Sequence, residues 1–169
     1  MLIILGGLPG TGKTTIAREL ARQVGAVHLR IDSIEQALLD SGCLSPPIDK
    51  AGYVAAYAVA GDNLGIGRTV IADSVNALSI TRDAWLAVAK RAAVSAIEVE
   101  ILCSDVEEHK RRVETRIADI PGLKLPTWQA VISREYHPWN RAHTMIDTAG
   151  KSVEQNVLAL RAVLASRTG

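Results

Sequence analysis

The sequence predicts a single α/β domain, a mostly parallel sheet covered by helices on both faces. Short apolar runs alternate with segments whose apolar residues recur at helical spacing, and this alternation is typical of strand–helix–strand units. The first run, Met1–Leu5, is apolar throughout, as expected of a central strand buried on both faces. A chain of 169 residues suffices for one domain, residues 1–169, with its own core.

Each expected element is bounded by residues typical of strand or helix ends. Gly25 ends the first helix, and Ser104 with Glu107 predicts a capping box at the start of a later one. An irregular, Pro- and Gly-containing stretch follows that later helix, and we expect a lid at approximately residues 112–126. Strands are expected at residues 1–5, 26–31, 69–72, 97–103 and 144–147. Helices are expected at residues 13–24, 34–39, 49–64, 81–93, 105–118, 127–136 and 153–165.

The composition excludes several classes of protein. A formal net charge of +1 provides no basic field of the kind that attracts nucleic acid. Cys43 and Cys103 have neither metal-ligand spacing nor the density of a disulfide framework. No secretion signal begins the chain, and its apolar runs are too short to span a bilayer. We therefore expect a cytoplasmic protein that does not associate with membranes.

The strongest motif lies between the first strand and the first helix. Gly7–Thr14 matches the pattern G-x-x-x-x-G-K-[ST] in the strand–loop–helix setting that this pattern requires. Glycines let backbone N–H groups converge on phosphate oxygens, and the helix N-terminus favours negative charge. Lys13 is expected on the β- and γ-phosphates, Thr14 on Mg²⁺ and Thr15 on the α-phosphate. The predicted ligands are ATP or GTP with Mg²⁺, held by Gly7, Leu8, Pro9, Gly10, Thr11, Gly12, Lys13, Thr14 and Thr15.

Nucleotide binding is compatible with a phosphotransferase, a hydrolysing switch or motor, or a binding protein. A GTPase switch needs a base-reading N-K-x-D loop, which the sequence lacks. A motor commonly has Asp-Glu after an apolar strand, whereas the strands here end in "IDS", "ADS" and "IDT". Transfer of a phosphoryl group to a bound acceptor is therefore the favoured class.

Aspartates follow three of the predicted strands, so we expect them at one rim of the sheet. Asp32 is the candidate for the carboxylate that orients and deprotonates an acceptor hydroxyl, and its alternative role is to cap the next helix. Asp73 is expected to support Mg²⁺, or else to form a strand-end turn. Asp147 is expected to form a turn beside the adenine.

Two arginines could close over the nucleotide. Arg112 and Arg116 are four residues apart on the expected helix 105–118, so they should share a face, next to a buried stripe of Val106, Val113 and Ile117. Arginines over the triphosphate would neutralise charge that develops during transfer. The alternative is a solvated basic face with pairs such as Glu108–Arg112.

Taken together, "GLPGTGKTT", "RIDS", "VIADSVNALSITRDAW", "RRVETR" and "SREY" resemble the small P-loop kinases that phosphorylate hydroxyl groups. Polynucleotide 5′-kinase, chloramphenicol phosphotransferase, zeta-type toxins and gluconate kinase are of this kind. The resemblance implies a P-loop NTPase fold with strand order 2-3-1-4-5 and a short lid. It also implies a general-base role for Asp32, lid roles for Arg112 and Arg116, and acceptor-side or metal-side roles for Asp73, Asn76 and Arg82.

One departure bears on the acceptor. The polynucleotide kinase pattern would place an arginine where Glu35 stands, and a carboxylate is a poor partner for a nucleic-acid phosphate. This favours a small, uncharged molecule with a hydroxyl group over a nucleic acid. The open alternatives are a nucleotide or polynucleotide 5′-hydroxyl kinase and an ATP-binding regulatory protein without an acceptor. The segment Arg134–Asn140 receives no role from the sequence.

Overall fold

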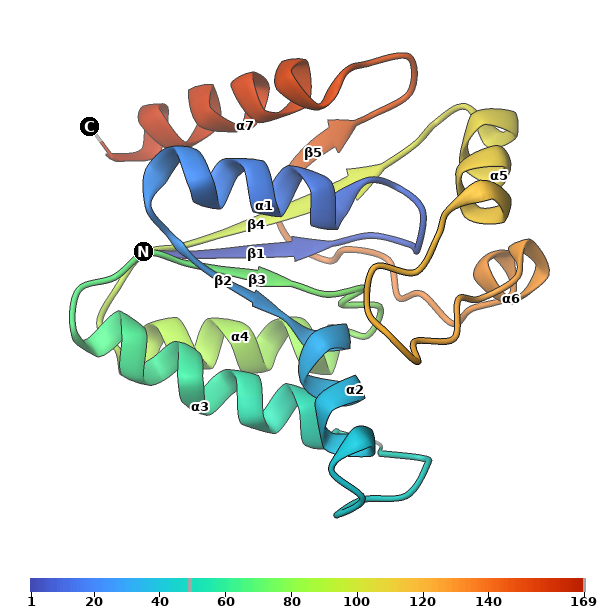
Figure 1. Ribbon diagram of the computed structural model, residues 1–169. Helices are drawn as coiled ribbons and strands as arrows, with labels where there is room; N and C mark the ends of the chain where they lie inside the picture. Colours follow the sequence, from blue (N-terminus) through green and yellow to red (C-terminus); the bar gives the residue numbers. More distant parts are fainter. Residues whose placement is uncertain (49, 169) are drawn as a thin grey trace.

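A computed structural model of the chain describes residues 1–48 and 50–168. Five strands form one parallel sheet in the order β2-β3-β1-β4-β5, and this confirms the predicted order (Figure 1). β1 lies in the centre, so the phosphate-loop motif leaves the middle of the sheet. The strands are β1 (Leu2–Gly6), β2 (Val27–Arg30), β3 (Val70–Asp73), β4 (Ala96–Leu102) and β5 (Thr144–Asp147).

The helices form two layers and an end group. α1 and α7 cover one face of the sheet, α3 and α4 cover the other, and α2, α5 and α6 lie near the carboxyl ends of the strands (Figure 1). The helices are α1 (Lys13–Val24), α2 (Ile31–Asp40), α3 (Ala51–Gly65), α4 (Ser79–Arg91), α5 (Val106–Thr115), α6 (Trp128–Ile132) and α7 (Val153–Thr168). Residue 49, where the sequence predicted the start of the third helix, lies outside the described residues.

The apolar run at the start of the chain serves two cores. Ile3 and Leu5 belong to the core beneath α1 and α7, whereas Leu2 and Ile4 belong to the core beneath α3 and α4. Successive side chains of a strand point to opposite faces, so a strand covered on both sides is apolar at every position. This explains why the run shows no alternation.

Near the carboxyl ends of the strands, three helices have bounds that differ from the prediction. β2 runs directly into α2, which begins at Ile31, so Asp32 lies in the first turn of the helix and not before it. α6 ends at Ile132 and not at Tyr136. α5 ends at Thr115 and not at Ala118, and the chain from residue 116 to residue 127 has neither helix nor strand. We call residues 116–127 the lid loop.

The cap of α5 also differs from the prediction. Asp105 is the N-cap residue, and its carboxylate accepts a hydrogen bond of 2.9 Å from the backbone N–H of Glu108. Ser104 instead donates to Asp147 at the end of β5. An aspartate one residue later therefore takes the capping role predicted for Ser104, and it bonds the N–H of Glu108 in place of that of Glu107. Among the described residues, none of the helices has the length and apolar character needed to cross a bilayer.

Candidate functional site

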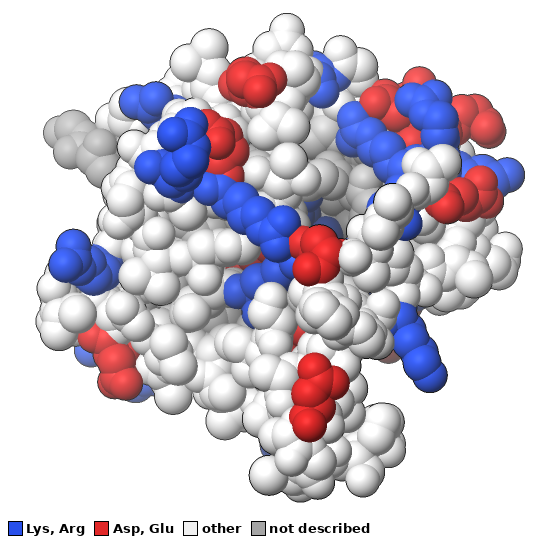
Figure 2. All heavy atoms as spheres, in the orientation of Figure 1, with Lys and Arg blue, Asp and Glu red and all other residues white. Residues whose placement is uncertain are grey.

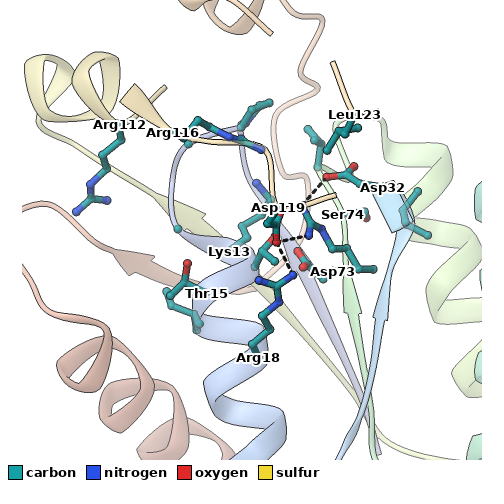
Figure 3. A pocket seen from close by; sticks show the side chains of 18 of the residues that line it. Lys13, Thr15, Arg18, Asp32, Asp73, Ser74, Arg112, Arg116, Asp119 and Leu123 are labelled. Atoms are coloured by element: carbon teal, nitrogen blue, oxygen red, sulfur yellow. Dashed lines mark hydrogen bonds and ion pairs between the residues drawn. The ribbon is translucent and has the colours of Figure 1, made fainter. Parts of the chain in front are cut away.

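A cavity of about 990 Å³ lies at the carboxyl ends of the strands. Its walls come from the phosphate loop, the junction of β2 with α2, the end of β3, α5 and the lid loop (Figure 3). Six of the nine residues predicted to hold the nucleotide line this cavity: Pro9, Gly10, Gly12, Lys13, Thr14 and Thr15.

The phosphate loop folds around the carbonyl oxygen of Leu8. That oxygen accepts hydrogen bonds from the Lys13 ammonium at 2.8 Å and from the Thr11 hydroxyl at 3.0 Å. Gly10 and Gly12 have φ angles of +86° and +94°, in the region that side chains disfavour. Gly7 passes so close to the Ile101 carbonyl that a Cβ atom would collide with it. The glycines of the motif are therefore required by the shape of the loop.

Two side chains outside the motif hold the loop from behind. The His109 ring of α5 contacts the Pro9 carbonyl oxygen at 2.8 Å. The Thr148 hydroxyl, just after β5, donates to the Thr11 carbonyl oxygen at 3.0 Å. Both side chains are buried. The loop is thus anchored to α5 and to the residue that follows β5.

The Lys13 ammonium is buried at the base of the cavity. Burial lowers the pKa of Lys13 to about 8, although the nearby carboxylates of Asp73 and Asp32 oppose the change. The charge of Arg116 lowers it further. A triphosphate would supply the negative charge that this buried ammonium lacks.

The Asp32 carboxylate is 41% exposed, lines the cavity and lies 3.6 Å from the Arg30 guanidinium. It does not cap α2, whose N-cap residue is Arg30 and which has no side-chain cap. Glu35 and Tyr53 line the same part of the cavity. Burial and the neighbouring Asp32 raise the pKa of Glu35. The geometry therefore leaves Asp32 available to a ligand.

Asp73, at the end of β3, lines the cavity with a side chain that is only 2% exposed. One carboxylate oxygen lies 3.0 Å from Nε2 of His28, which holds the side chain in place. Thr14 lines the same cavity, and the described residues contain no cluster of three or more potential metal-binding His, Cys, Asp or Glu side chains. One hydroxyl and one carboxylate suit Mg²⁺, which commonly takes few protein ligands together with phosphates and water.

Arg112 and Arg116 both line the cavity, but they do not share a helical face. α5 ends before Arg116, whose backbone is extended, and in Figure 3 its side chain reaches towards the cavity. Arg112 is held by Glu108 at 2.6 Å and by the Thr148 hydroxyl at 2.8 Å, so the alternative pair Glu108–Arg112 is present. Within residues 1–48 and 50–168, the Arg116 guanidinium has no hydrogen bond or ion pair, so it is free to face a phosphate.

The buried stripe predicted beside these arginines is only partly present. Val113 is buried, whereas Val106 is 60% exposed and Ile117 is 90% exposed. Ile117 is exposed because the helix has ended before it. Val113 packs close to Gly10 of the phosphate loop.

Asn76 and Arg82 are not brought to the cavity. Both are buried, and the Asn76 amide donates to the Leu5 carbonyl oxygen at 2.6 Å. Arg82 donates to the His137 carbonyl oxygen at 2.8 Å, and its guanidinium lies 4.5 Å from the centre of the Trp139 ring. The expected acceptor roles of these two residues find no support in this geometry. Arg82 instead holds the segment Arg134–Asn140, which had no role from the sequence.

Asp147 forms the turn that was expected of it. Its carboxylate accepts hydrogen bonds from the backbone N–H groups of Ser104 at 3.0 Å and Ala149 at 3.1 Å. The Ser104 hydroxyl also donates a hydrogen bond to this carboxylate. That bond, together with the two backbone bonds, lowers the pKa of Asp147. They fix the connection that carries Thr148 to the phosphate loop.

Six charged residues of the cavity wall received no site role from the sequence: Arg18, Arg30, Asp119, Lys124, Arg134 and Lys151. Arg30 stood inside a predicted strand and Arg18 inside a predicted helix, where a lone cation usually faces solvent. The quoted stretches "RIDS" and "SREY" contain Arg30 and Arg134, but spacing alone does not distinguish a cavity arginine from a surface one.

A sequence model of the AAA domain family matches residues 2–133. Uncharacterized proteins of Mycobacterium tuberculosis and Mycobacterium bovis are 33% identical over 88% of this chain. The match covers 32% of those relatives, so the chain spans about a third of their length.

Solved structures share the fold across almost the whole chain. A putative kinase of Chloroflexus aurantiacus superposes with a TM-score of 0.74 at 23% identity, over 98% of this chain and 96% of that one. The APS kinase CysC of Mycobacterium tuberculosis, in complex with AMPPNP and APS, has a TM-score of 0.73 at 16% identity, over 97% and 96%. A gluconokinase of Sinorhizobium meliloti has a TM-score of 0.64 at 18% identity, over 98% and 94%.

Identities this low show a shared fold, and that fold is the predicted P-loop NTPase architecture. The sequence match is the stronger link, because it covers the phosphate loop, Asp32, Asp73, α5 and the lid loop. The chain therefore belongs to the AAA domain family.

Proposed function

We propose that the chain is a Mg²⁺-dependent phosphotransferase that moves the γ-phosphoryl group of ATP, or GTP, to a hydroxyl group of a small molecule. One observation carries this proposal: the exposed Asp32 carboxylate and the Lys13 ammonium face the same cavity. The similarity in fold to an APS kinase and a gluconokinase gives further support.

In this reaction the Asp32 carboxylate accepts the proton of the acceptor hydroxyl. The hydroxyl oxygen forms a bond to the γ-phosphorus while the bond to the β–γ bridging oxygen breaks, and the nucleoside diphosphate leaves. Such transfers depend mainly on positioning and on neutralising charge. The Asp32 carboxylate is 41% exposed and lies beside the Arg30 guanidinium, so an acceptor hydroxyl can reach it from the cavity.

The cations of the cavity take up the charge of the triphosphate. Lys13 would contact the β- and γ-phosphates, and the unpaired Arg116 would reach them from the lid loop. Arg112 lies further back, against Thr148, and would act through the phosphate loop. Thr14 and Asp73 would hold Mg²⁺, which when bound offsets part of the negative charge on the phosphates.

The test is the variant Asp32→Asn. It should retain its affinity for Mg·AMPPNP, because Asp32 lies on the acceptor side, and should lose about 10²–10⁴ in the rate of transfer. The measurement is the release of ADP that an alcohol stimulates, over a panel of sugars, polyols, nucleosides and hydroxylated antibiotics. Asp40→Asn is the matched control, since Asp40 lies on the same helix but outside the cavity wall.

Equal loss of nucleotide affinity and transfer in Asp32→Asn would contradict the role of Asp32 as base. A slow turnover of ATP that none of the alcohols accelerates would favour an ATP-binding regulatory protein instead.

A further inference from the structure

One wall of the cavity contains a buried guanidinium. Arg30 is the last residue of β2, and its side chain is only 5% exposed although it lines the cavity. Its Nε atom is buried without a hydrogen-bond partner among the described residues. A buried cation is costly unless anions surround it. The strand holds Arg30 in this position, so the positive charge is a fixed feature of the wall.

The anion that faces Arg30 comes from the lid loop. The Asp119 carboxylate accepts a hydrogen bond of 2.8 Å from Arg30, and the same oxygen accepts one of 2.5 Å from Arg18 of α1 (Figure 3). Asp119 lies outside every helix and strand, whereas both arginines lie within one. One loop carboxylate therefore fills an oxyanion position between two arginines that the fold holds in place.

The charges around the cavity exceed the needs of a nucleotide. Among the described residues, eight Lys and Arg side chains line it, against four Asp and Glu side chains, one of which is Asp119. A triphosphate with Mg²⁺ bound has part of its charge already offset, so it leaves some of this surplus unmatched. Figure 2 shows basic and acidic side chains meeting near the centre of this face, next to the hollow below α1.

We propose that the acceptor carries an oxyanion, a phosphate, sulfate or carboxylate group, which replaces the Asp119 carboxylate between Arg18 and Arg30. This inference rests on the proposed function, because it names the acceptor of that same transfer. Binding of the acceptor would then also release the lid loop from α1 and β2. The Asp119 carboxylate occupies the position between Arg18 and Arg30 that we assign to this oxyanion.

The position of Arg30 limits the shape of such an acceptor. One terminal nitrogen of Arg30 contacts Asp119, and the other lies 3.6 Å from the Asp32 carboxylate. An oxyanion in the place of Asp119 would lie one guanidinium away from the proposed base. The reacting hydroxyl and the oxyanion should therefore be only a few bonds apart. We therefore propose a small anionic alcohol as the acceptor, in place of the uncharged molecule that Glu35 suggested.

Inorganic phosphate is the probe for this site, with the phosphate loop filled by Mg·AMPPNP. Calorimetry should give weak phosphate binding to the unmodified chain and at least about tenfold tighter binding to Asp119→Asn, because a neutral amide no longer competes for the guanidinium groups. Adding Arg30→Gln to Asp119→Asn should abolish the gain. Arg22→Gln is the control, since Arg22 lies on α1, pairs with Glu19 and does not line the cavity.

Phosphate affinity that is equal in the unmodified chain and in Asp119→Asn would overturn the inference. Retained Mg·AMPPNP binding in each variant shows that the fold is intact, so a loss in the double variant can be assigned to Arg30.

Matched acceptors separate this inference from the proposed function. In the pairs glycerol with glycerol phosphate, and glucose with glucose 6-phosphate, the second member carries a phosphate group on one hydroxyl and keeps the other hydroxyls free. Faster ADP release with the phosphorylated member of a pair supports both ideas. Release that only neutral alcohols of the panel stimulate would retain the kinase and overturn the oxyanion site. If tightened phosphate binding to Asp119→Asn comes with no acceptor turnover, the oxyanion site stands and the transferase is contradicted.

Discussion

Lys13 is a buried cation, and a bound triphosphate would supply the negative charge that neutralises it. Its pKa, lowered to about 8, means that the side chain still carries its proton at neutral pH. A bound triphosphate favours the protonated form, so its affinity should be constant below about pH 8 and should fall as pH rises above that value, approaching tenfold per pH unit. Titration calorimetry with Mg·AMPPNP between pH 6.5 and 9.5 measures this.

The lowered pKa of Lys13 also makes the stability of the folded chain depend on pH. The folded pKa lies below the ordinary value of 10.5, so between pH 8 and 10.5 the unfolded chain binds more protons than the folded one. The contribution of Lys13 to the free energy of unfolding therefore rises with pH in that window. Lys13→Met should remove this rise and the affinity profile together. An unchanged profile in Lys13→Met would assign the titration to another group.

The sequence predicted the roles of some single residues but not of others. The roles of Lys13 and Thr14 follow from a motif whose chemistry depends on adjacent positions. Arg30 and Asp119 are 89 residues apart, and their contact depends on how the lid loop crosses the end of β2. No local sequence pattern predicts a contact between residues so far apart in the chain. The same holds for Asn76, whose polar side chain turned out to brace β1 from within the core.

The helix α5 packs against the phosphate loop. A Cβ atom on Gly10 would meet Val113 of α5 and approach the His109 ring, and the φ of Gly10 is +86°. Gly10→Ala should therefore displace α5 and weaken Mg·AMPPNP binding by at least about tenfold, since the cost of a left-handed alanine, about 1 kcal/mol, comes in addition to the collision. Fluorescence titration with a labelled nucleotide measures this.

Gly25→Ala is the matched control, because Gly25 has a φ of +65° but nothing within 4 Å of its missing Cβ. It should lower the free energy of unfolding by about 1 kcal/mol and leave nucleotide affinity unchanged. Equal nucleotide affinity in Gly10→Ala and Gly25→Ala would mean that the loop and α5 are not coupled.

The elements that sequence predicted best are those with two independent signals. α1 has a helical stripe and a glycine end, and its predicted bounds, Lys13–Val24, are those observed. The C-terminal end of α5 was predicted three residues too late because Arg116, Ile117 and Ala118 all favour helix locally. The chain turns there to begin the lid loop, and the sequence shows no stop signal before Pro121.

Arg141 joins three parts of the chain. Its guanidinium contacts both carboxylate oxygens of Glu98 on β4, at 2.6 and 2.9 Å, and Asp83 on α4 at 2.6 Å. Glu98 is buried, so Arg141→Met leaves a carboxylate without its partner and should lower the free energy of unfolding by about 1–3 kcal/mol. Urea unfolding followed by circular dichroism measures this.

Arg141→Lys should recover only part of the loss, because lysine retains the charge but not the two-pronged geometry. The double variant Arg141→Met with Glu98→Gln should be more stable than Arg141→Met alone. If the double variant is no more stable, the buried carboxylate is not the source of the loss.

The overall architecture could be predicted from the order of strands and helices along the chain. Apolar runs of strand length alternating with helices allow few arrangements other than a covered parallel sheet, and the alternating burial of Leu2 and Ile3 on its two faces follows from that. Strand order depended on the resemblance to small P-loop kinases and is confirmed. The route of residues 133–143 depends on pairs such as Arg141 with Glu98, which composition does not reveal.

Trp139 offers a natural optical signal. Its indole ring packs against Gly6, where β1 enters the phosphate loop. The ring centre of Trp128 lies 5.1 Å from that of His109, which contacts Pro9 of the same loop. Any ligand that rearranges the loop alters the surroundings of two native chromophores. Emission of the unlabelled chain should therefore shift when nucleotide is added, and this makes rapid-mixing kinetics accessible without attached dyes.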